Sequence, residues 1–243
     1  MGRPKADLPW HGSTLLRRTV GIVARAVDGP VVVVRAPGQR LPDLPADTLV
    51  RDDDTAGLGP LQGLAVGLAA VADQADTAYV SSTDLPFLHV AFVRRVLAGF
   101  GPGTEVVLPI VGGFRQPLAA GYRTSLAPLV AELVADGQLR PAFLFERCRV
   151  VRLDEATLVA DPDLAASDPG LESVVNVNEP ADYAAALARP APLVTVFPGP
   201  RTVRAATVSE AAAGRPFTLA TVNGVPIRDG SFPLVAGDTV HLP

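Results

Sequence analysis

Lysine is scarce in this chain: of its 21 basic residues only Lys5 is a lysine, and the others are arginines. Such a bias is typical of GC-rich coding, which supplies arginine wherever a surface cation suffices. Lysine is then retained where a compact ammonium on a flexible stem is needed and a planar guanidinium cannot replace it. Lys5 ends the run Met1-Gly2-Arg3-Pro4-Lys5, and either it has a specific role there or it is a tail lysine kept by chance.

Cysteine, histidine and long apolar runs are also scarce. Cys148 is the single cysteine, which excludes a disulfide framework within the chain and favours a reducing, cytoplasmic setting. The histidines His11, His89 and His241 have no metal-ligand spacing, so we expect no zinc site. No apolar run reaches the length of a membrane span, and the N-terminus lacks the pattern of a signal peptide. We therefore expect a soluble intracellular protein.

Charge of one sign is not in excess. The net charge is −4, so no basic field indicates nucleic acid or an anionic membrane as a partner. Hydrophobic residues make up 48% of the chain and charged residues 19%, which is ample for an ordered core. The 22 glycines and 24 prolines favour a loop-rich architecture over a helical bundle.

Helical and strand periodicities alternate from residue 14 to about residue 160. This alternation predicts an α/β fold with a doubly wound, Rossmann-like sheet. Strands are expected at 31–34, 48–50, 77–82 and 105–108, and helices around 16–27, 61–68, 93–97 and 126–133. Ligands of such sheets bind beyond the carboxyl ends of the strands, so the residues just after each strand are the candidates for a site.

The expected first strand of the sheet is missing. A doubly wound domain normally opens with a strand and a glycine-rich turn, whereas this chain opens on a polar segment and reaches a helix by about residue 14.

Asp84 is the first candidate for a metal-binding role, because it follows an expected buried strand in Ser81-Ser82-Thr83-Asp84-Leu85-Pro86. A carboxylate there could hold Mg²⁺ against a triphosphate, since Mg²⁺ prefers one or two carboxylates together with phosphate oxygens and water. A turn or helix-capping aspartate explains the same residue.

A glycine-rich segment, Gly57-Leu58-Gly59-Pro60-Leu61-Gln62-Gly63, follows three aspartates at 52–54. Glycines allow a flat ring to approach the backbone, and a carboxylate can accept two N–H bonds from the edge of guanine. A helix that begins with proline at its first position fits the same residues.

Two further segments carry polar candidates. Asn176 and Asn178 in Asn-Val-Asn-Glu-Pro could place amide oxygens near a metal or a phosphate, or could simply cap a helix. Arg115 and Gln116 in Arg-Gln-Pro-Leu could bind an anion, although an exposed arginine is usually just solvated.

The order of these segments closely resembles that of molybdenum cofactor guanylyltransferase and the small nucleotidyltransferases around it. The order is Gly-x-x-Lys, Asp with Gly-Pro-Leu-Gln-Gly, Asp-x-Pro after a strand, Gln-Pro-Leu, and Asn-Val-Asn-x-Pro. The resemblance covers residues 1 to about 187, and we expect a nucleotidyltransferase domain at 1–188.

The resemblance implies roles for the candidate residues. Lys5 would contact the nucleotide phosphates, Asp84 would carry Mg²⁺, and Asp53 or Asp52 would meet the guanine. The nucleotide site would also include Gly59, Pro60, Leu61 and Gly63. Acceptor or phosphate contacts would come from Arg115, Gln116, Asn178 and Asn176.

The implied reaction is attack by the terminal phosphate of molybdopterin on the α-phosphate of GTP, with release of pyrophosphate. Three alternatives stay open: a cytidylyltransferase using CTP, a transferase for another phosphorylated acceptor, and a non-catalytic adaptor that docks enzymes of the cofactor pathway.

The sequence departs from the family pattern in two places. Family members have a strand and a Leu-Ala-Gly-Gly-x-Ser-x-Arg loop before the Met-Gly-x-x-Lys segment, so we expect a misassigned start and a truncated N-terminus. Glu179 also stands where a threonine is more usual.

After a Pro/Ala linker, residues 193–243 are predicted to form a small, mostly β module. Its Val222-Asn223-Gly224 turn and its Pro-Leu-Val-Ala-Gly-Asp-Thr-Val segment at 233–240 resemble the β-grasp sulfur carriers. Those carriers end in Gly-Gly, which this chain lacks, so the expected role is docking or structural.

Overall fold

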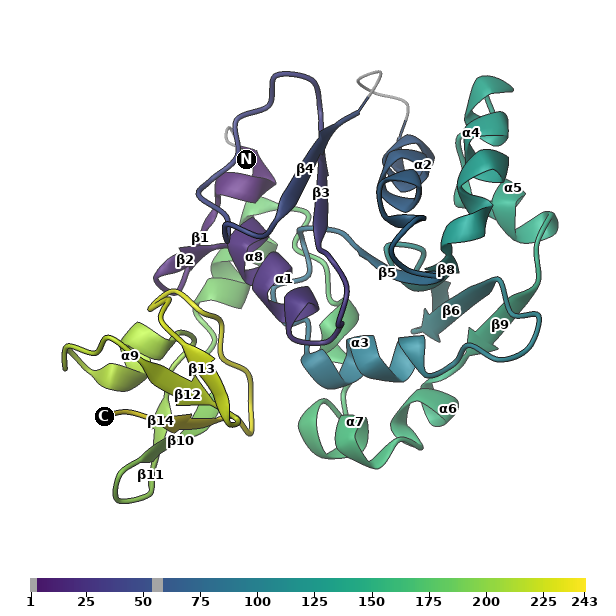
Figure 1. Cartoon of the computed structure of the whole chain (residues 1–243). Coiled ribbons are helices and arrows are strands. Elements are labelled where there is room, and N and C mark those ends of the chain that lie inside the picture. Colours follow the sequence, from purple (N-terminus) through teal and green to yellow (C-terminus); the bar gives the residue numbers. More distant parts are fainter. Residues whose placement is uncertain (1–3, 54–58) are drawn as a thin grey trace.

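Strands and helices alternate in the N-terminal part of the chain, which confirms the predicted α/β class (Figure 1). The computed structural model describes residues 4–53 and 59–243. Met1, Gly2 and Arg3 of the N-terminal run, and Asp54, Gly57 and Leu58 of the glycine-rich segment, therefore lie outside the described residues. The elements that frame the site are η1 (Lys5–Asp7), β1 (Pro9–Trp10), β2 (Ser13–Thr14), α1 (Leu15–Ala24), β3 (Val32–Arg35), β4 (Leu49–Asp52), α2 (Pro60–Val71) and β5 (Thr77–Ser81). They are followed by α3 (Val90–Leu97), β6 (Val106–Val111), β7 (Phe114–Arg115), β8 (Ala119–Arg123), η2 (Thr124–Leu126), α4 (Ala127–Ala135), α5 (Pro141–Glu146), β9 (Val150–Leu153), α6 (Glu155–Val159), α7 (Pro162–Ser167), η3 (Glu172–Val174) and α8 (Pro180–Leu187).

The described strands of the N-terminal part form three sheets, one of them the short β1–β2 hairpin, in place of the single doubly wound sheet that the sequence predicted. β3 and β4 form a separate parallel pair. β5, β8, β6 and β7 follow one another in a mixed sheet, and β9 pairs with β6 in parallel. β8 runs antiparallel to both of its neighbours, which a purely parallel sheet does not allow. The expected opening strand is not present among residues 4–53, where η1 and the short β1–β2 hairpin precede α1.

Apolar faces hold these layers together. The inward faces of α2 and α4 pack with β6 and β8 in one cluster that includes Leu61, Leu68 and Tyr122. The opposite side of the mixed sheet is covered by α3, whose Phe92 and Val96 are fully buried. Gly121 of β8 is needed for this packing, because a Cβ there would lie 2.7 Å from the ring of Phe100.

The C-terminal part has its own sheet and its own core. The sheet has five strands in the order β11 (Arg201–Arg204), β10 (Leu193–Phe197), β14 (Thr239–His241), β12 (Ala220–Val222), β13 (Val225–Ile227), and α9 (Val208–Ala212) packs against it. Asn223 and Gly224 have positive φ angles of 50° and 83° in the β12–β13 turn, as a tight hairpin requires. The mostly β character expected for residues 193–243 is confirmed.

The C-terminal part docks on α1, which the sequence had not indicated. Arg25 forms an ion pair with Asp238 at 2.6 Å, and Arg17 forms one with Asp229 at 2.6 Å. Gly21 faces Pro233 so closely that a Cβ at Gly21 would lie 2.6 Å from the proline Cγ. The two parts are therefore packed against each other along α1 (Figure 1), and Val235 also packs in the apolar cluster around α3.

No helix among the described residues is both long and apolar enough to span a membrane.

Candidate active site

Three polar side chains from distant parts of the sequence meet at one point. The Lys5 ammonium donates to Asp84 Oδ2 at 2.8 Å and to Asn178 Oδ1 at 2.9 Å. Side-chain exposure is 33% for Lys5 and 17% for Asp84, so the pair is partly shielded but open to a ligand. The chain's single lysine therefore contacts the aspartate and one of the asparagines that the sequence analysis had singled out.

Lys5 is held in place by the short helix η1, which it begins. The Leu8 amide donates to the Lys5 carbonyl at 3.2 Å, and Ala6 packs with Leu16 and Val20 of α1 in a small apolar cluster. This anchoring argues against a tail lysine left by chance. It fixes the backbone and leaves the flexible stem of the lysine free to reach across the site.

Asp84 lies just beyond the carboxyl end of β5, where an α/β sheet places its ligands. Ser82 Oγ donates to Asp84 Oδ1 at 2.6 Å, and the Val177 amide donates to the Asp84 carbonyl at 3.0 Å. The next residue, Leu85, is buried in the core. Asp84 is thus not a helix cap: its two carboxylate oxygens are oriented by Ser82 and Lys5.

Asn178 reaches the site because α8 is capped by other residues. The backbone amides of Asn178 and Glu179 donate to Asp182 Oδ2 at 3.2 and 3.0 Å, and Glu179 is the N-cap of the helix. The Asn178 side chain is left to accept from Lys5. Asn176 does not join the cluster, because its side chain points back toward the Val174 carbonyl at 3.4 Å.

The two candidate guanine-binding aspartates differ in their surroundings. Asp52, at the end of β4, accepts from Arg35 Nε at 2.7 Å. Asp53 is half-buried, and its Oδ1 has no hydrogen-bond partner among the residues that the structure describes. An unsatisfied buried carboxylate oxygen is costly, so Asp53 is the better placed of the two to accept N–H donors from a ligand.

The glycine-rich segment starts α2, six residues after Asp53 in the sequence. Gly59 is the N-cap residue with φ 77°, a conformation that favours glycine, and Pro60 occupies the first turn. The Leu61 side chain is fully buried in the core, so a contact from this residue to a nucleotide would have to use its backbone. At Gly63, the space where a side chain would stand is open.

Arg115 ends β7 of the β6–β7 hairpin, and Gln116 directly follows it. Arg115 is exposed, and the Gln116 side chain lies near the Phe114 carbonyl at 3.4 Å. The Ser82 amide donates to the Leu118 carbonyl at 3.0 Å, which places this segment beside the loop that carries Asp84. Neither side chain contacts the Lys5 cluster directly among the hydrogen bonds between described residues.

The donor set around Asp84 suits a magnesium ion that arrives with a nucleotide. Within residues 4–53 and 59–243 no group of three or more His, Cys, Asp and Glu side chains could hold a metal by itself. One carboxylate with neighbouring hydroxyl and amide oxygens from Ser82 and Asn178 fits Mg²⁺, whose remaining ligands are normally phosphate oxygens and water.

Sequence reasoning missed Ser82, although it lies in the segment quoted for Asp84. The only signal was the change from buried strand residues to polar ones at the end of β5, and this change does not reveal which hydroxyl faces the carboxylate.

Comparisons with known proteins identify the family of the chain. A family model described as a MobA-like NTP transferase domain matches residues 1–151. A probable molybdenum cofactor guanylyltransferase from Mycobacterium tuberculosis H37Rv is 39% identical over 157 residues, covering 63% of this chain and 76% of the relative. Its counterpart from Mycobacterium ulcerans Agy99 is 38% identical over 176 residues, covering 70% and 85%.

Solved structures share the fold. Molybdopterin-guanine dinucleotide biosynthesis protein A from Archaeoglobus fulgidus gives a TM-score of 0.59 at 20% identity, covering 76% of this chain and 89% of that protein. The Mycobacterium tuberculosis protein Rv0371c, solved as a manganese complex, gives 0.50 at 17% identity, covering 77% and 94%. The chain belongs to the MobA-like NTP transferase family, a family of nucleotidyltransferases.

Proposed function

We propose that this protein transfers GMP from GTP to the terminal phosphate of molybdopterin and releases pyrophosphate. The observation that carries the proposal is the convergence of Lys5, Asp84 and Asn178 at the carboxyl end of β5. The names of the relatives at 38–39% identity support the choice of substrates. The acceptor phosphate would attack the α-phosphorus of GTP while the bond to the pyrophosphate oxygen breaks.

The side chains of the cluster would act by position and charge, with no covalent enzyme intermediate. Lys5 would exchange its contact with Asp84 for the triphosphate and would balance the negative charge that builds up there. Asn178 would keep the ammonium over the site during this exchange. Asp84, oriented by Ser82, would hold Mg²⁺, which supplies charge neutralisation on the phosphate oxygens when bound.

Asp53, Gly59 and Pro60 would form the base end of the nucleotide site. The unsatisfied Oδ1 of Asp53 suits the two N–H donors of guanine, whereas the same edge of cytosine offers an acceptor. Asp52 is engaged by Arg35 and is the less suitable partner. Arg115 and Gln116, on the segment beside the Asp84 loop, would contact the acceptor.

We also infer that the chain has two domains, residues 1–188 and 193–243, and that the second is a β-grasp-like docking domain. Its mixed sheet packed on α9, with an apolar cluster of its own, supports this inference. Enzymes of the same cofactor pathway would be its partners.

The test is pyrophosphate release by the purified protein with Mg²⁺, molybdopterin, and either GTP or CTP. We expect release with GTP, and we expect Asp84→Asn to lower the rate at least 100-fold while the unfolding midpoint stays the same. The matched control is Asp163→Asn, an exposed carboxylate of α7 remote from the site, which should leave the rate unchanged (Figure 1).

Each alternative predicts a different result. Faster turnover with CTP would favour a cytidylyltransferase, and turnover only with another phosphorylated acceptor would reassign the second substrate. Failure to bind any nucleotide would favour a non-catalytic adaptor. A normal rate in Asp84→Asn would reject the role given to Asp84.

A further inference from the structure

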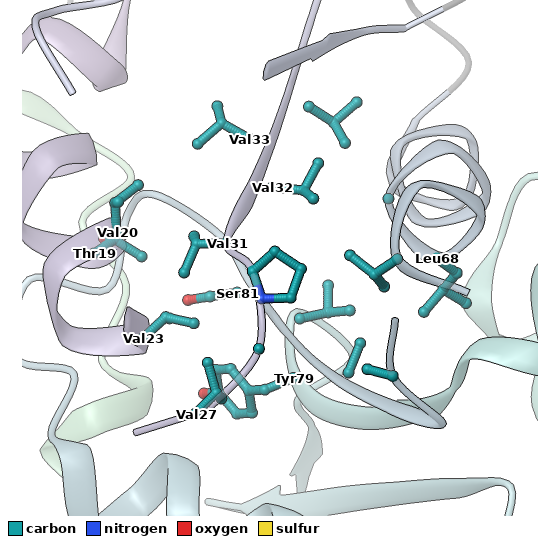
Figure 2. A pocket seen from close by; sticks show the side chains of 18 of the residues that line it. Thr19, Val20, Val23, Val27, Val31, Val32, Val33, Leu68, Tyr79 and Ser81 are labelled. Carbon is teal, nitrogen blue, oxygen red and sulfur yellow. The ribbon is translucent and has the colours of Figure 1, made fainter. Parts of the chain in front are cut away.

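A cavity of about 190 Å³ lies where the N-terminal and C-terminal parts of the chain meet. Trp10, Arg18 and Phe87 line it from the N-terminal part, and Val235 lines it from the C-terminal part. The Lys5 cluster does not belong to its wall, so the cavity is separate from the candidate active site. It also differs from the larger cavity of about 680 Å³ between β3 and β5, where valine side chains predominate (Figure 2). The smaller cavity combines apolar and charged side chains.

Arg18 brings a positive charge without a partner to this wall. The residue is 7% exposed, its Nε donates to the Pro86 carbonyl at 2.7 Å, and its Nη1 donates to the Leu234 carbonyl at 3.2 Å. Nη2 has no hydrogen-bond partner among the described residues, and Arg18 forms no ion pair with a described carboxylate. The nearby carboxylate of Asp238 is engaged by Arg25. A buried charge without a partner is costly, so an anion beside Arg18 is indicated.

Trp10 adds a second free donor to the same wall. The residue is 4% exposed, and its indole N–H makes no hydrogen bond within the described part of the chain. The protein encloses neither this nitrogen nor Nη2 of Arg18 completely, so both face open space, and both side chains line this cavity. Indole and guanidinium groups donate hydrogen bonds and do not accept them. An occupant must therefore bring acceptor oxygens.

The acidic side chains of the wall are already engaged. Glu172 pairs with Arg189, whose guanidinium stacks on the Phe87 ring at 4.2 Å from its centre. Both carboxylate oxygens of Asp168 accept from backbone amides, those of Glu172 and Ser173, at 2.7 and 2.9 Å. Asp168 would repel a second negative charge in the cavity. A ligand with a single negative charge therefore fits better than a dianion.

The two histidines of the wall add no free donor of comparable strength. His89 accepts from the Ala91 amide through Nδ1 at 3.1 Å, and its Nε2 faces the Ala236 carbonyl at 3.3 Å. Burial lowers the pKa of His89, so this ring is neutral at pH 7.5. His11 packs against the edge of the Trp10 ring, with 5.1 Å between the ring centres. Arg18 and Trp10 are thus the anion-binding end of the cavity.

We propose that this cavity binds a small organic monocarboxylate. The carboxylate would accept from Arg18 Nη2 and Trp10 Nε1, because the guanidinium fork matches the geometry of a carboxylate. The apolar body would lie against Phe87 and Val235. A protein cavity of about 150 Å³ can hold benzene, so this one has room for a small ring that carries a carboxylate. The proposal does not depend on the transferase reaction.

The test follows 4-fluorobenzoate by fluorine NMR while the full chain is added, with 4-fluorobenzamide as the uncharged counterpart. We expect the benzoate to bind, and the benzamide to bind about tenfold more weakly or worse, because it has no charge to pair with Arg18. Trp10 is the single tryptophan of the chain, so its fluorescence should change along the same saturation curve.

Four variants locate the ligand. Arg18→Met should weaken benzoate binding about tenfold or more, and Trp10→Phe, which keeps a ring and removes the N–H, about threefold or more. Arg215→Met removes an exposed arginine outside the cavity wall and should leave binding unchanged. Lys5→Met should also leave it unchanged, because the candidate active site is separate. Circular dichroism checks that each variant is folded, and Trp10→Phe decides the question if Arg18→Met does not fold.

Several results would overturn the proposal. No binding of benzoate to the folded protein would show that the cavity is not an anion site. Unchanged affinity in Trp10→Phe and in folded Arg18→Met, or loss of binding in Lys5→Met, would place the ligand elsewhere. Equal binding of benzamide would remove the role of the charge. Tighter binding of inorganic phosphate than of benzoate would reject a monocarboxylate as the ligand.

Discussion

The contact between the two parts of the chain depends heavily on one buried carboxylate. Asp238 is 2% exposed and accepts from the Arg25 guanidinium at 2.6 and 2.9 Å, from Asn223 Nδ2 at 2.8 Å and from the Val235 amide at 2.8 Å. Removing one partner of a buried pair leaves the other charge uncompensated, at a cost of about 3–5 kcal/mol. We expect Asp238→Ala to lower the free energy of unfolding by about this amount.

Two comparison variants test whether the loss of stability comes from an unpaired buried charge or from the loss of any ion pair between the two parts. Asp229 pairs with Arg17 but its side chain is 41% exposed, so Asp229→Ala should cost no more than about 1 kcal/mol. Replacing both members of the buried pair, Arg25→Met with Asp238→Leu, should cost less than Asp238→Ala alone, because no unpaired charge remains.

Urea unfolding followed by circular dichroism and by Trp10 fluorescence measures these differences. Trp10 lies in the N-terminal part, so its signal reports on that part, whereas circular dichroism reports on both. A loss in the free energy of unfolding below about 1 kcal/mol in Asp238→Ala would refute the reasoning, since the buried pair would then contribute no more than an exposed ion pair does.

Three further predictions each concern a single residue. Tyr79→Phe should raise the free energy of unfolding by about 1 kcal/mol in thermal or urea melts, because it removes a buried hydroxyl that has no hydrogen-bond partner among the described residues. Burial raises the pKa of the Cys148 thiol from 9.0 to about 11, so at pH 8 the native protein should react with a disulfide reagent about 100-fold more slowly than the unfolded chain. Equal rates would contradict this. Gly21→Ala should destabilise the protein by about 1 kcal/mol, since the clash with Pro233 outweighs the gain in helix propensity.

Much of the candidate site was predictable because its residues lie next to sequence patterns that indicate a strand, a helix start or a turn. The buried strand before Asp84, the proline-started helix after Gly59 and the turn before α8 are each visible within about ten residues of sequence. Their order along the chain resembles a known family pattern, which gave Lys5, first noted as the single lysine, its predicted role. The contact from Lys5 to Asp84 and Asn178 itself joins residues far apart in sequence, and only the fold determines it.

The sheet was less predictable because strand pairing is non-local. β8 has the sequence Ala-Ala-Gly-Tyr-Arg, which lacks β-branched residues, and its place between β5 and β6 reverses the expected direction. Gly121 weakens the strand signal further, although the close approach of Phe100 requires it. The docking of the C-terminal part was not visible either, because arginines on α1 look like ordinary surface cations until their partners are known.

Arg18 connects this docking with the candidate site. It is buried, and it donates to the Pro86 carbonyl at 2.7 Å and to the Leu234 carbonyl at 3.2 Å, so it joins the loop after Asp84 to the C-terminal part. Burial lowers the pKa of Arg18 to about 10, and the side chain stays charged at neutral pH. In Asp238→Ala the bond from Arg18 to Pro86 remains, so stability should fall while the affinity for GTP with Mg²⁺ stays within about threefold. Arg18→Leu should lower both, and loss of affinity in Asp238→Ala alone would show that the docked part itself shapes the site.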